Sequence, residues 1–133
     1  MHLNDYVLVV ADDDAEMRAA YVGMLEPKGF TVHACSDGEE AIRLCRTHKP
    51  AAVVLDLLMP GLDGFAAAHR LRADPDLCEI RRIAITAFAD VRSSARAWDA
   101  GFHEFLPKPI RVSMLLAMVR PTRDMQGVID PAG

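Results

Sequence analysis

Acidic, hydroxyl and amino side chains follow the ends of apolar segments that lie far apart in the chain. Asp12, Asp13 and Asp14 come directly after the apolar run at 6–11, and Asp56 interrupts another apolar run. Thr86 and Lys108 stand at the ends of two further runs. Clustered carboxylates repel one another, and burial raises their pKa unless a cation neutralises them. Brought together, these groups would suit a site for a cation and a phosphoryl group.

The chemistry of these donors favours a hard cation. Carboxylate oxygens without neighbouring histidine or cysteine select Mg²⁺, Mn²⁺ or Ca²⁺ over Zn²⁺. Mg²⁺ keeps several waters and typically takes one or two carboxylates together with phosphate oxygens. The 5 histidines have no metal-binding spacing, and the 3 cysteines are widely spaced without a CxxC pair. The residues therefore suit a phosphoryl-transfer centre that holds a hard divalent cation.

Strand-like and helix-like segments alternate along the chain, so that each of these polar groups follows a strand. The run at 6–11 is apolar on both parities, which is typical of a central parallel strand covered on both faces. We expect the strands at 6–11, 30–35, 51–55, 82–86 and 103–106, and the helices at 15–26, 36–47, 64–72, 90–100 and 110–120. This alternation predicts an α/β fold, a doubly wound five-stranded parallel sheet with helices on both faces. A site then lies at the carboxyl ends of the strands.

The ends of several helices carry residues that favour those positions. Asp14 and Asp63 precede expected helices and are suited to cap them, since an aspartate oxygen accepts from the free backbone amides of the first turn. Gly101 follows the expected fourth helix and is suited to end it. Within that helix, Trp98 shares a helical spacing with Val91 and Ala95, which predicts that the indole belongs to the core.

Length and composition indicate one ordered domain. With 133 residues, 51% of them hydrophobic and 26% charged, the chain can bury a core of its own. The net charge of −4 disfavours nucleic-acid binding, which rewards a concentrated positive face. The apolar runs are too short to span a bilayer, and the opening residues lack the pattern of a signal peptide. We expect a cytoplasmic protein with no membrane contact, a domain at 1–121 and a short disordered tail at 122–133.

Five short motifs occur in order at characteristic spacings. They are VVADDD at 9–14 with Met17-Arg18, DLLMPGLDG at 56–64, Thr86-Ala87, Ala100-Gly101, and FLPKP at 105–109. Together they resemble the receiver domains of bacterial two-component response regulators, of the single-domain chemotaxis type. The resemblance covers about residues 5–120, and it implies a flavodoxin-like strand order 2-1-3-4-5.

The resemblance implies a phosphoacceptor and its metal ligands. Asp56 would accept a phosphoryl group from a sensor histidine kinase or a histidine phosphotransfer protein. Asp13 and Asp56 would hold Mg²⁺ directly, together with the backbone carbonyl of Leu58, and Asp12 would act through a water. The chain would then be a phosphorylation-activated signalling switch. It would catalyse its own phosphorylation and a slow autodephosphorylation, rather than act as a conventional enzyme.

The resemblance also implies the groups that respond to the phosphoryl group. The Thr86 hydroxyl and the Lys108 ammonium would bind its oxygens, and the Lys108–Pro109 bond would be cis, an isomer that needs proline. Thr86 and Phe105 would form the conformational switch. Phe105 stands where many members carry tyrosine, so the aromatic ring would swing without the hydrogen bond of that hydroxyl.

In similar receivers, the side chains two residues after the phosphoacceptor and two residues after the threonine flank the approach of a hydrolytic water, and the resemblance implies this role for two apolar residues here. Leu58 follows Asp56 by two residues, and Phe88 follows Thr86 by two residues. Neither side chain can hydrogen-bond an attacking water, and both can obstruct it. We therefore expect a long-lived phosphorylated state.

The expected partners include a downstream protein as well as the kinase or phosphotransfer protein. A downstream protein would bind the face formed by the fourth helix, the fifth strand and the fifth helix, and the resemblance also allows a homodimer.

One alternative function is that of a small Mg²⁺-dependent phosphatase or phosphotransferase of similar fold, although such enzymes usually need a cap region that this sequence has no insertion to build. Another is a pseudo-receiver that binds partners without phosphorylation, against which the intact acid, threonine and lysine set argues.

Overall fold

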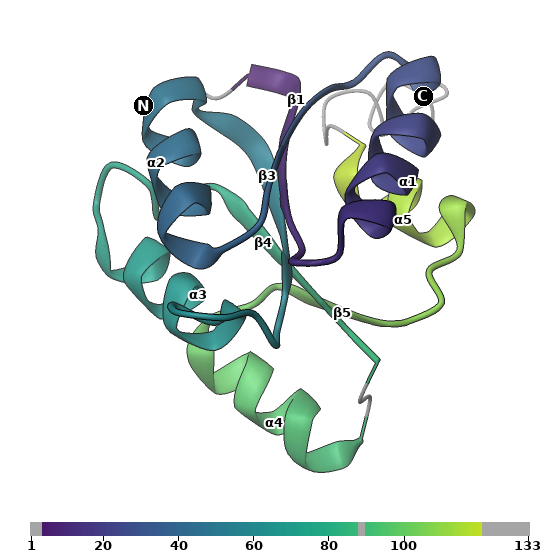
Figure 1. The fold of residues 1–133 in the computed structure, drawn as a ribbon. Coiled ribbons are helices and arrows are strands. Elements are labelled where there is room, and N and C mark those ends of the chain that lie inside the picture. Colours follow the sequence, from purple (N-terminus) through teal and green to yellow (C-terminus); the bar gives the residue numbers. More distant parts are fainter. Residues whose placement is uncertain (1–3, 88–89, 121–133) are drawn as a thin grey trace, which may run out of the picture.

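Parallel strands and the helices that connect them make up the computed structural model, which describes residues 4–87 and 90–120 (Figure 1). The strands are β1 (Asn4–Ala11), β2 (Thr31–Cys35), β3 (Pro50–Asp56), β4 (Arg81–Thr86) and β5 (Glu104–Pro107). The helices are α1 (Ala15–Leu25), α2 (Gly38–His48), α3 (Gly64–Ala73), α4 (Val91–Ala100) and α5 (Val112–Val119), with a short 3₁₀ turn, η1 (Glu26–Lys28), after α1. All neighbouring strands are parallel, in the order β2-β1-β3-β4-β5. The predicted fold class and strand order are confirmed.

The helices divide between the two faces of the sheet (Figure 1). α1 and α5 cover one face, where Tyr21, Leu25 and Leu115 are fully buried in a common apolar cluster. α2, α3 and α4 cover the other face and enclose a second cluster. Because both faces are covered, residues 8–11 of β1 have no exposed surface, which explains why this segment is apolar on both parities.

Capping residues set the starts and ends of the helices as the sequence predicts. The Asp14 carboxylate accepts from the backbone amides of Glu16 and Met17 at the start of α1, and the Asp63 carboxylate accepts from the amide of Ala66 in α3. Gly101 has φ 102° where α4 ends, a conformation that glycine adopts without a Cβ clash.

Some boundaries differ from the prediction for local reasons. β1 begins two residues earlier than expected, at Asn4, because its backbone amide donates to the carbonyl of Lys49, 2.9 Å away, just before β3. α1 ends at Leu25, since Pro27 leads the chain into the 3₁₀ turn.

The prediction that Trp98 lies in the core is wrong. The side chain of Trp98 is 50% exposed and Ala95 is exposed, whereas Ala97 is fully buried. α4 therefore contributes Ala97 to the apolar cluster, and the exposed indole lies outside it. Phe88 and the predicted tail at 122–133 lie outside the described residues. In the part of the chain that the structure describes, no helix is both long enough and apolar enough to cross a membrane.

Candidate functional site

The ends of β1, β3 and β5 bring the predicted acidic and basic side chains together. Asp12 and Asp13 follow β1, Asp56 is the last residue of β3, and Lys108 follows β5. The order of the sheet reverses between β1 and β3, since β2 lies beyond β1 while β4 and β5 lie beyond β3. Loops diverge at such a reversal and leave a crevice for a ligand at the carboxyl ends of the strands.

Lys108 joins two buried carboxylates. Its Nζ lies 2.8 Å from Oδ2 of Asp56 and 3.0 Å from Oδ2 of Asp12. The side chain of Asp12 has no exposed surface and that of Asp56 is 9% exposed, so the ammonium offsets much of the cost of burying two like charges.

The pKa values of this pair reflect burial and mutual contact. Burial raises the pKa of Asp56, against the lowering effect of the hydrogen bonds from Lys108 and from the Leu58 amide. Burial alone would lower the pKa of Lys108, but its hydrogen bonds and charge contacts with Asp56 and Asp12 outweigh burial and raise it. Lys108 is therefore held as an ammonium beside the carboxylate.

Asp12 is held on both carboxylate oxygens. Its Oδ1 accepts from the Asp14 backbone amide at 2.9 Å, and its Oδ2 accepts from Lys108 and from the hydroxyl of Tyr21 at 3.3 Å. Arg18 donates to the backbone carbonyl of Asp12 at 2.9 Å. These contacts fix the carboxylate from the start of α1 as well as from the end of β5.

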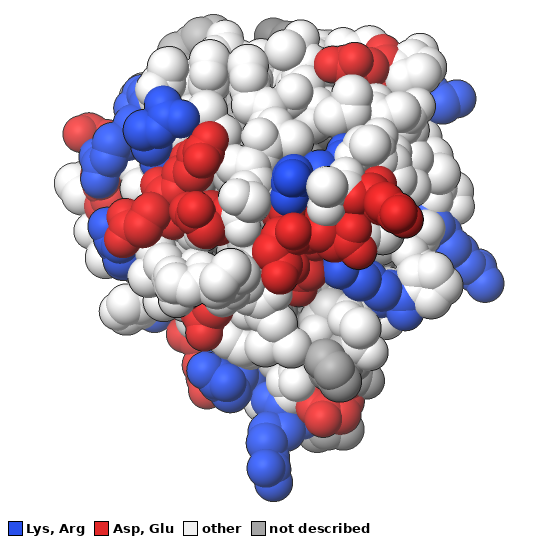
Figure 2. All heavy atoms as spheres, in the orientation of Figure 1, with Lys and Arg blue, Asp and Glu red and all other residues white. Residues whose placement is uncertain are grey.

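Asp12, Asp13 and Asp56 form a donor set that fits a hard divalent cation. One carboxylate oxygen from each lies within 4.8 Å of those of the other two. Asp13 is exposed while its two partners are buried, so the group opens to solvent on one side. Figure 2 shows acidic side chains gathered over the end of β1. Oxygen ligands with two buried charges match the coordination that Mg²⁺ prefers.

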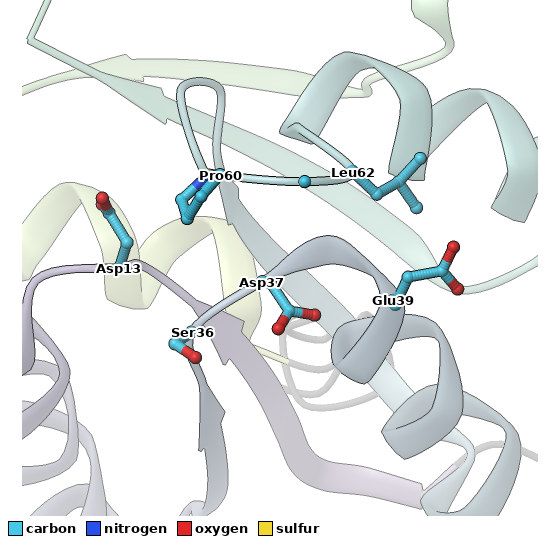
Figure 3. A pocket seen from close by; sticks show the side chains of 7 residues that line it. Asp13, Ser36, Asp37, Glu39, Pro60 and Leu62 are labelled. Carbon is cyan, nitrogen blue, oxygen red and sulfur yellow. The ribbon is translucent and has the colours of Figure 1, made fainter.

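A shallow pocket lies beside Asp13. It has a volume of about 580 Å³ and is lined by loops that follow β1, β2 and β3. Figure 3 shows Asp13 on one side of it, Pro60 and Leu62 from the loop after β3, and Asp37 and Glu39 from the start of α2. This depression therefore borders the acidic group on the side of Asp13.

The loop after β3 folds tightly against the end of the strand and aims a backbone amide at Asp56. The Leu58 amide donates to Oδ1 of Asp56 at 3.1 Å. The loop closes where the Gly64 amide donates to the carbonyl of Leu57 at 3.1 Å. A side chain at Gly64 would collide with the backbone of Asp56 and Leu57, so only glycine permits this approach. Gly61, with φ 72°, supplies the turn.

Thr86 is placed next to the acidic group by the register of the sheet. Asp56 pairs with Ile85, so Thr86 stands one residue beyond the end of β3, and it is 1% exposed. Its backbone carbonyl accepts from the Lys108 amide at 2.8 Å. Thr86 and Leu58, whose side chain is 52% exposed, line a common cleft of about 380 Å³.

Phe105 lies in β5, three residues before Lys108. The half-buried ring packs against the apolar cluster under α2, α3 and α4. The Lys108–Pro109 peptide bond is cis, as the resemblance implies.

Sequence reasoning missed one contact of this site. Tyr21 in α1 was indistinguishable from an apolar core residue, yet its hydroxyl contacts Asp12. The available signal was chemical, because a tyrosine on the buried side of a helix needs a hydrogen-bond partner for its hydroxyl.

Comparisons with known proteins agree with this geometry. Residues 7–120 match the family described as the response regulator receiver domain. The response regulator MprA of Mycolicibacterium vanbaalenii is 36% identical over 113 residues, which are 85% of this chain and 48% of that protein. The chain thus spans about half the length of the curated relatives it matches.

Solved structures of receiver domains share the fold over most of the chain. The signal receiver domain of a histidine kinase from Syntrophus aciditrophicus is 28% identical, with a TM-score of 0.80 over 92% of each chain. The receiver domain of a sensor histidine kinase from Pseudomonas aeruginosa is 25% identical, with a TM-score of 0.80 over 87% of this chain and 95% of that one. That structure has a magnesium ion coordinated in its active site cleft. The protein belongs to the response regulator receiver domain family.

Proposed function

We propose that the chain is a phosphorylation-activated switch of a two-component phosphorelay, in which Asp56 accepts a phosphoryl group. The observation that carries this proposal is the contact of 2.8 Å between the Lys108 ammonium and Asp56, a buried carboxylate at the end of β3. A lysine and a cluster of carboxylates at the reversal point of a doubly wound sheet suit phosphoryl transfer. The family assignment does not favour the alternative phosphatase.

The donor is a phosphohistidine of a sensor histidine kinase or of a histidine phosphotransfer protein. An oxygen of the Asp56 carboxylate attacks phosphorus, the P–N bond breaks, and the histidine nitrogen leaves with the bonding electron pair. The Lys108 ammonium and the Thr86 hydroxyl then bind phosphoryl oxygens. Asp13, Asp56 and the Leu58 carbonyl, with Asp12 through a water, would hold Mg²⁺, which neutralises charge on the transferring group.

Lys108 connects phosphorylation to a change in the protein. In the unphosphorylated chain its ammonium bridges Asp56 and Asp12. When Asp56 carries a phosphoryl group, that group offers a stronger acceptor at the same place, so the lysine and the end of β5 adjust. Thr86 and Phe105 carry this adjustment into β4 and β5 in the proposed switch.

We further propose that a downstream protein binds the face formed by α4, β5 and α5. Three large apolar side chains on α4 and α5 support this choice, since Trp98 is 50%, Val112 37% and Met114 44% exposed. A homodimer through the same face is the competing outcome. Sedimentation of the phosphorylated protein distinguishes them, because a concentration-dependent increase in mass would indicate self-association.

The proposed domain comprises residues 1–121, and we propose that it works in the cytoplasm. The cysteines support this location, since Cys35, Cys45 and Cys78 are all free.

Intact-mass measurement tests the proposed function. After incubation with a small phosphodonor and Mg²⁺, the wild-type chain should gain one phosphoryl group. Asp56→Asn should gain none. Asp63→Asn is the matched control, because asparagine also caps a helix and this position lies outside the carboxylate cluster. An undiminished adduct on Asp56→Asn would contradict the assignment.

A further inference from the structure

Tyr21 is a tyrosine in the core whose hydroxyl reaches the acidic group. Its side chain has no exposed surface and packs in the apolar cluster beneath α1 and α5. The hydroxyl donates to Oδ2 of Asp12 at 3.3 Å. Burial and the charge of Asp12 both raise the pKa of Tyr21, so the phenol keeps its proton and acts as a donor.

The position gives the ring and the hydroxyl separate tasks. A phenylalanine would fill the same apolar space, because the ring is surrounded by the cluster that also contains Leu25 and Leu115. A buried hydroxyl costs free energy unless it is hydrogen-bonded. The hydroxyl of Tyr21 therefore adds a directed contact to Asp12 that packing alone does not require.

The donors to Asp12 differ in how permanently they are attached to it. The Asp14 amide holds Oδ1 as part of the cap region of α1, while Oδ2 accepts from both Lys108 and Tyr21. Lys108 also contacts Asp56 and, in the proposed function, turns to the phosphoryl group. Tyr21 sits on α1 in the packed core, and its hydroxyl donates to Asp12. It is thus the side-chain donor that can stay with Oδ2 when Lys108 turns away.

We propose that Tyr21 is a positioning residue, whose hydroxyl orients the Asp12 carboxylate for Mg²⁺ independently of Lys108. The inference rests on the proposed function, because that function requires Mg²⁺ at the acidic group. Hydrogen-bond partners of metal-binding side chains commonly fix the orientation of those side chains. Here the partner comes from the core side of the first helix, so packing of the sheet against α1 contributes directly to the cation site.

Mg²⁺ titration of the unphosphorylated 133-residue chain tests this inference without measuring activity. Amide NMR shifts of residues 12–14 and 56–58 report binding. Tyr21→Phe keeps the ring and should weaken Mg²⁺ binding by roughly 3- to 10-fold. This loss is at or below the smallest losses of metal affinity that follow when a hydrogen-bond partner of a metal ligand is removed. Tyr6→Phe is the matched control, because Tyr6 is 38% exposed and is the other of the 2 tyrosines. Its affinity for Mg²⁺ should equal that of the wild type.

A spectroscopic signature gives a second readout, which follows the phenol of Tyr21 itself. Mg²⁺ held through a water on Asp12 would draw charge from this carboxylate and weaken it as an acceptor, so the near-UV absorption of Tyr21 should shift during the titration. The shift should be present in the wild type and in Tyr6→Phe and absent from Tyr21→Phe. A purely structural role of the ring would not produce this pattern.

The outcomes separate the inference from the proposed function. If the wild type binds Mg²⁺ but Tyr21→Phe binds it equally well, or if the wild type binds Mg²⁺ without a tyrosine shift, the inference is overturned and the proposed function stands. If the wild type does not bind Mg²⁺ at all, the proposed function fails and the inference fails with it.

Discussion

Two basic side chains are sheltered at opposite ends of the sheet, and their acceptors differ. Lys108, after β5, contacts the carboxylates of Asp56 and Asp12. Arg82, near the start of β4, is 4% exposed. In the described part of the chain, its guanidinium donates to the backbone carbonyls of Gly101 at 2.7 Å, Cys78 at 2.9 Å and Ile80 at 3.1 Å.

The difference in acceptors separates a movable contact from a fixed one. Burial and the neighbouring Arg72 charge lower the pKa of Arg82, whereas contact with two carboxylates raises that of Lys108. Arginine nevertheless remains charged in proteins. The backbone carbonyls that accept from Arg82 stay in place as long as the chain is folded. The hydrogen bonds of Arg82 therefore hold the loop before β4 against the loop after α4. A carboxylate that takes up a phosphoryl group changes what Lys108 contacts.

The largest expected effect is on the conformational response to phosphorylation at the end of the sheet that carries Lys108. Lys108→Ala should lose most of the amide NMR shifts that phosphorylation induces in β4 and β5, because the ammonium that reads the phosphoryl group is gone. Mg²⁺ binding should be retained, since the carboxylates remain. Lys28→Ala, at an exposed lysine, is the control. If the Lys108→Ala chain is phosphorylated and shows the same amide shifts as the wild type, the proposed difference between Lys108 and Arg82 is contradicted.

The next effect is on stability at the Arg82 end. Arg82→Met should lower the free energy of unfolding by about 3 kcal/mol, because it leaves buried carbonyls without donors. Arg81→Met, which breaks the partly exposed pair with Glu104, should cost about 1 kcal/mol or less. Urea denaturation measures both. If both variants lose the same free energy of unfolding, the buried hydrogen bonds of Arg82 do not stabilise the protein as proposed.

A smaller effect should appear in the lifetime of the phosphorylated state. Leu58 is exposed at the cleft that Thr86 also lines, and cannot position a water. Replacing Leu58 with Asn and Phe88 with Glu should speed loss of the phosphoryl group several-fold, since polar groups there can align the attacking water. The decay is followed after removal of the phosphodonor. Unchanged or slower decay in the double variant would contradict this reading.

The smallest expected effect is a pH dependence of stability at the Arg82 end. Nδ1 of His103 accepts from the Arg82 backbone amide at 3.0 Å, and this contact requires an unprotonated Nδ1. Burial, together with the charges of Arg82 and Arg81, lowers the pKa of His103. The unfolded chain therefore binds the proton more readily, so stability is full above about pH 6.5 and falls as the pH drops below it.

His103→Asn tests that pH dependence, because the amide oxygen can still accept while the group no longer titrates. Urea midpoints between about pH 5 and about pH 8 should depend less on pH than in the wild type. Some dependence should remain, since burial and the stacked ring of His48 also lower the pKa of His33. An unaltered pH profile would exclude His103 as a source.

The sequence predicted the cluster of charged side chains around Lys108, but it did not predict the hydrogen bonds of Arg82. Asp12, Asp56 and Lys108 each follow an apolar strand, and parallel strands bring such residues to one edge regardless of packing detail. Arg82 gave no comparable signal, because its acceptors are backbone carbonyls that any residue supplies.

Side-chain environments that depend on packing were also out of reach. Tyr21 and Trp98 both fit an apolar position of a helix. The structure buries Tyr21 against Asp12 and leaves Trp98 half exposed. The helical period gives the face of a residue, but the width of the buried strip depends on how each helix sits on the sheet.

Asp56 is the proposed site of the phosphoryl group, and chemical mapping of that position tests this assignment most directly. Borohydride reduces an aspartyl phosphate to homoserine, which tandem mass spectrometry locates in a peptide. After treatment with phosphodonor and Mg²⁺, homoserine should appear at position 56 and depend on the donor. Homoserine at Asp12 or Asp13 instead, with Asp56 unmodified, would contradict the account.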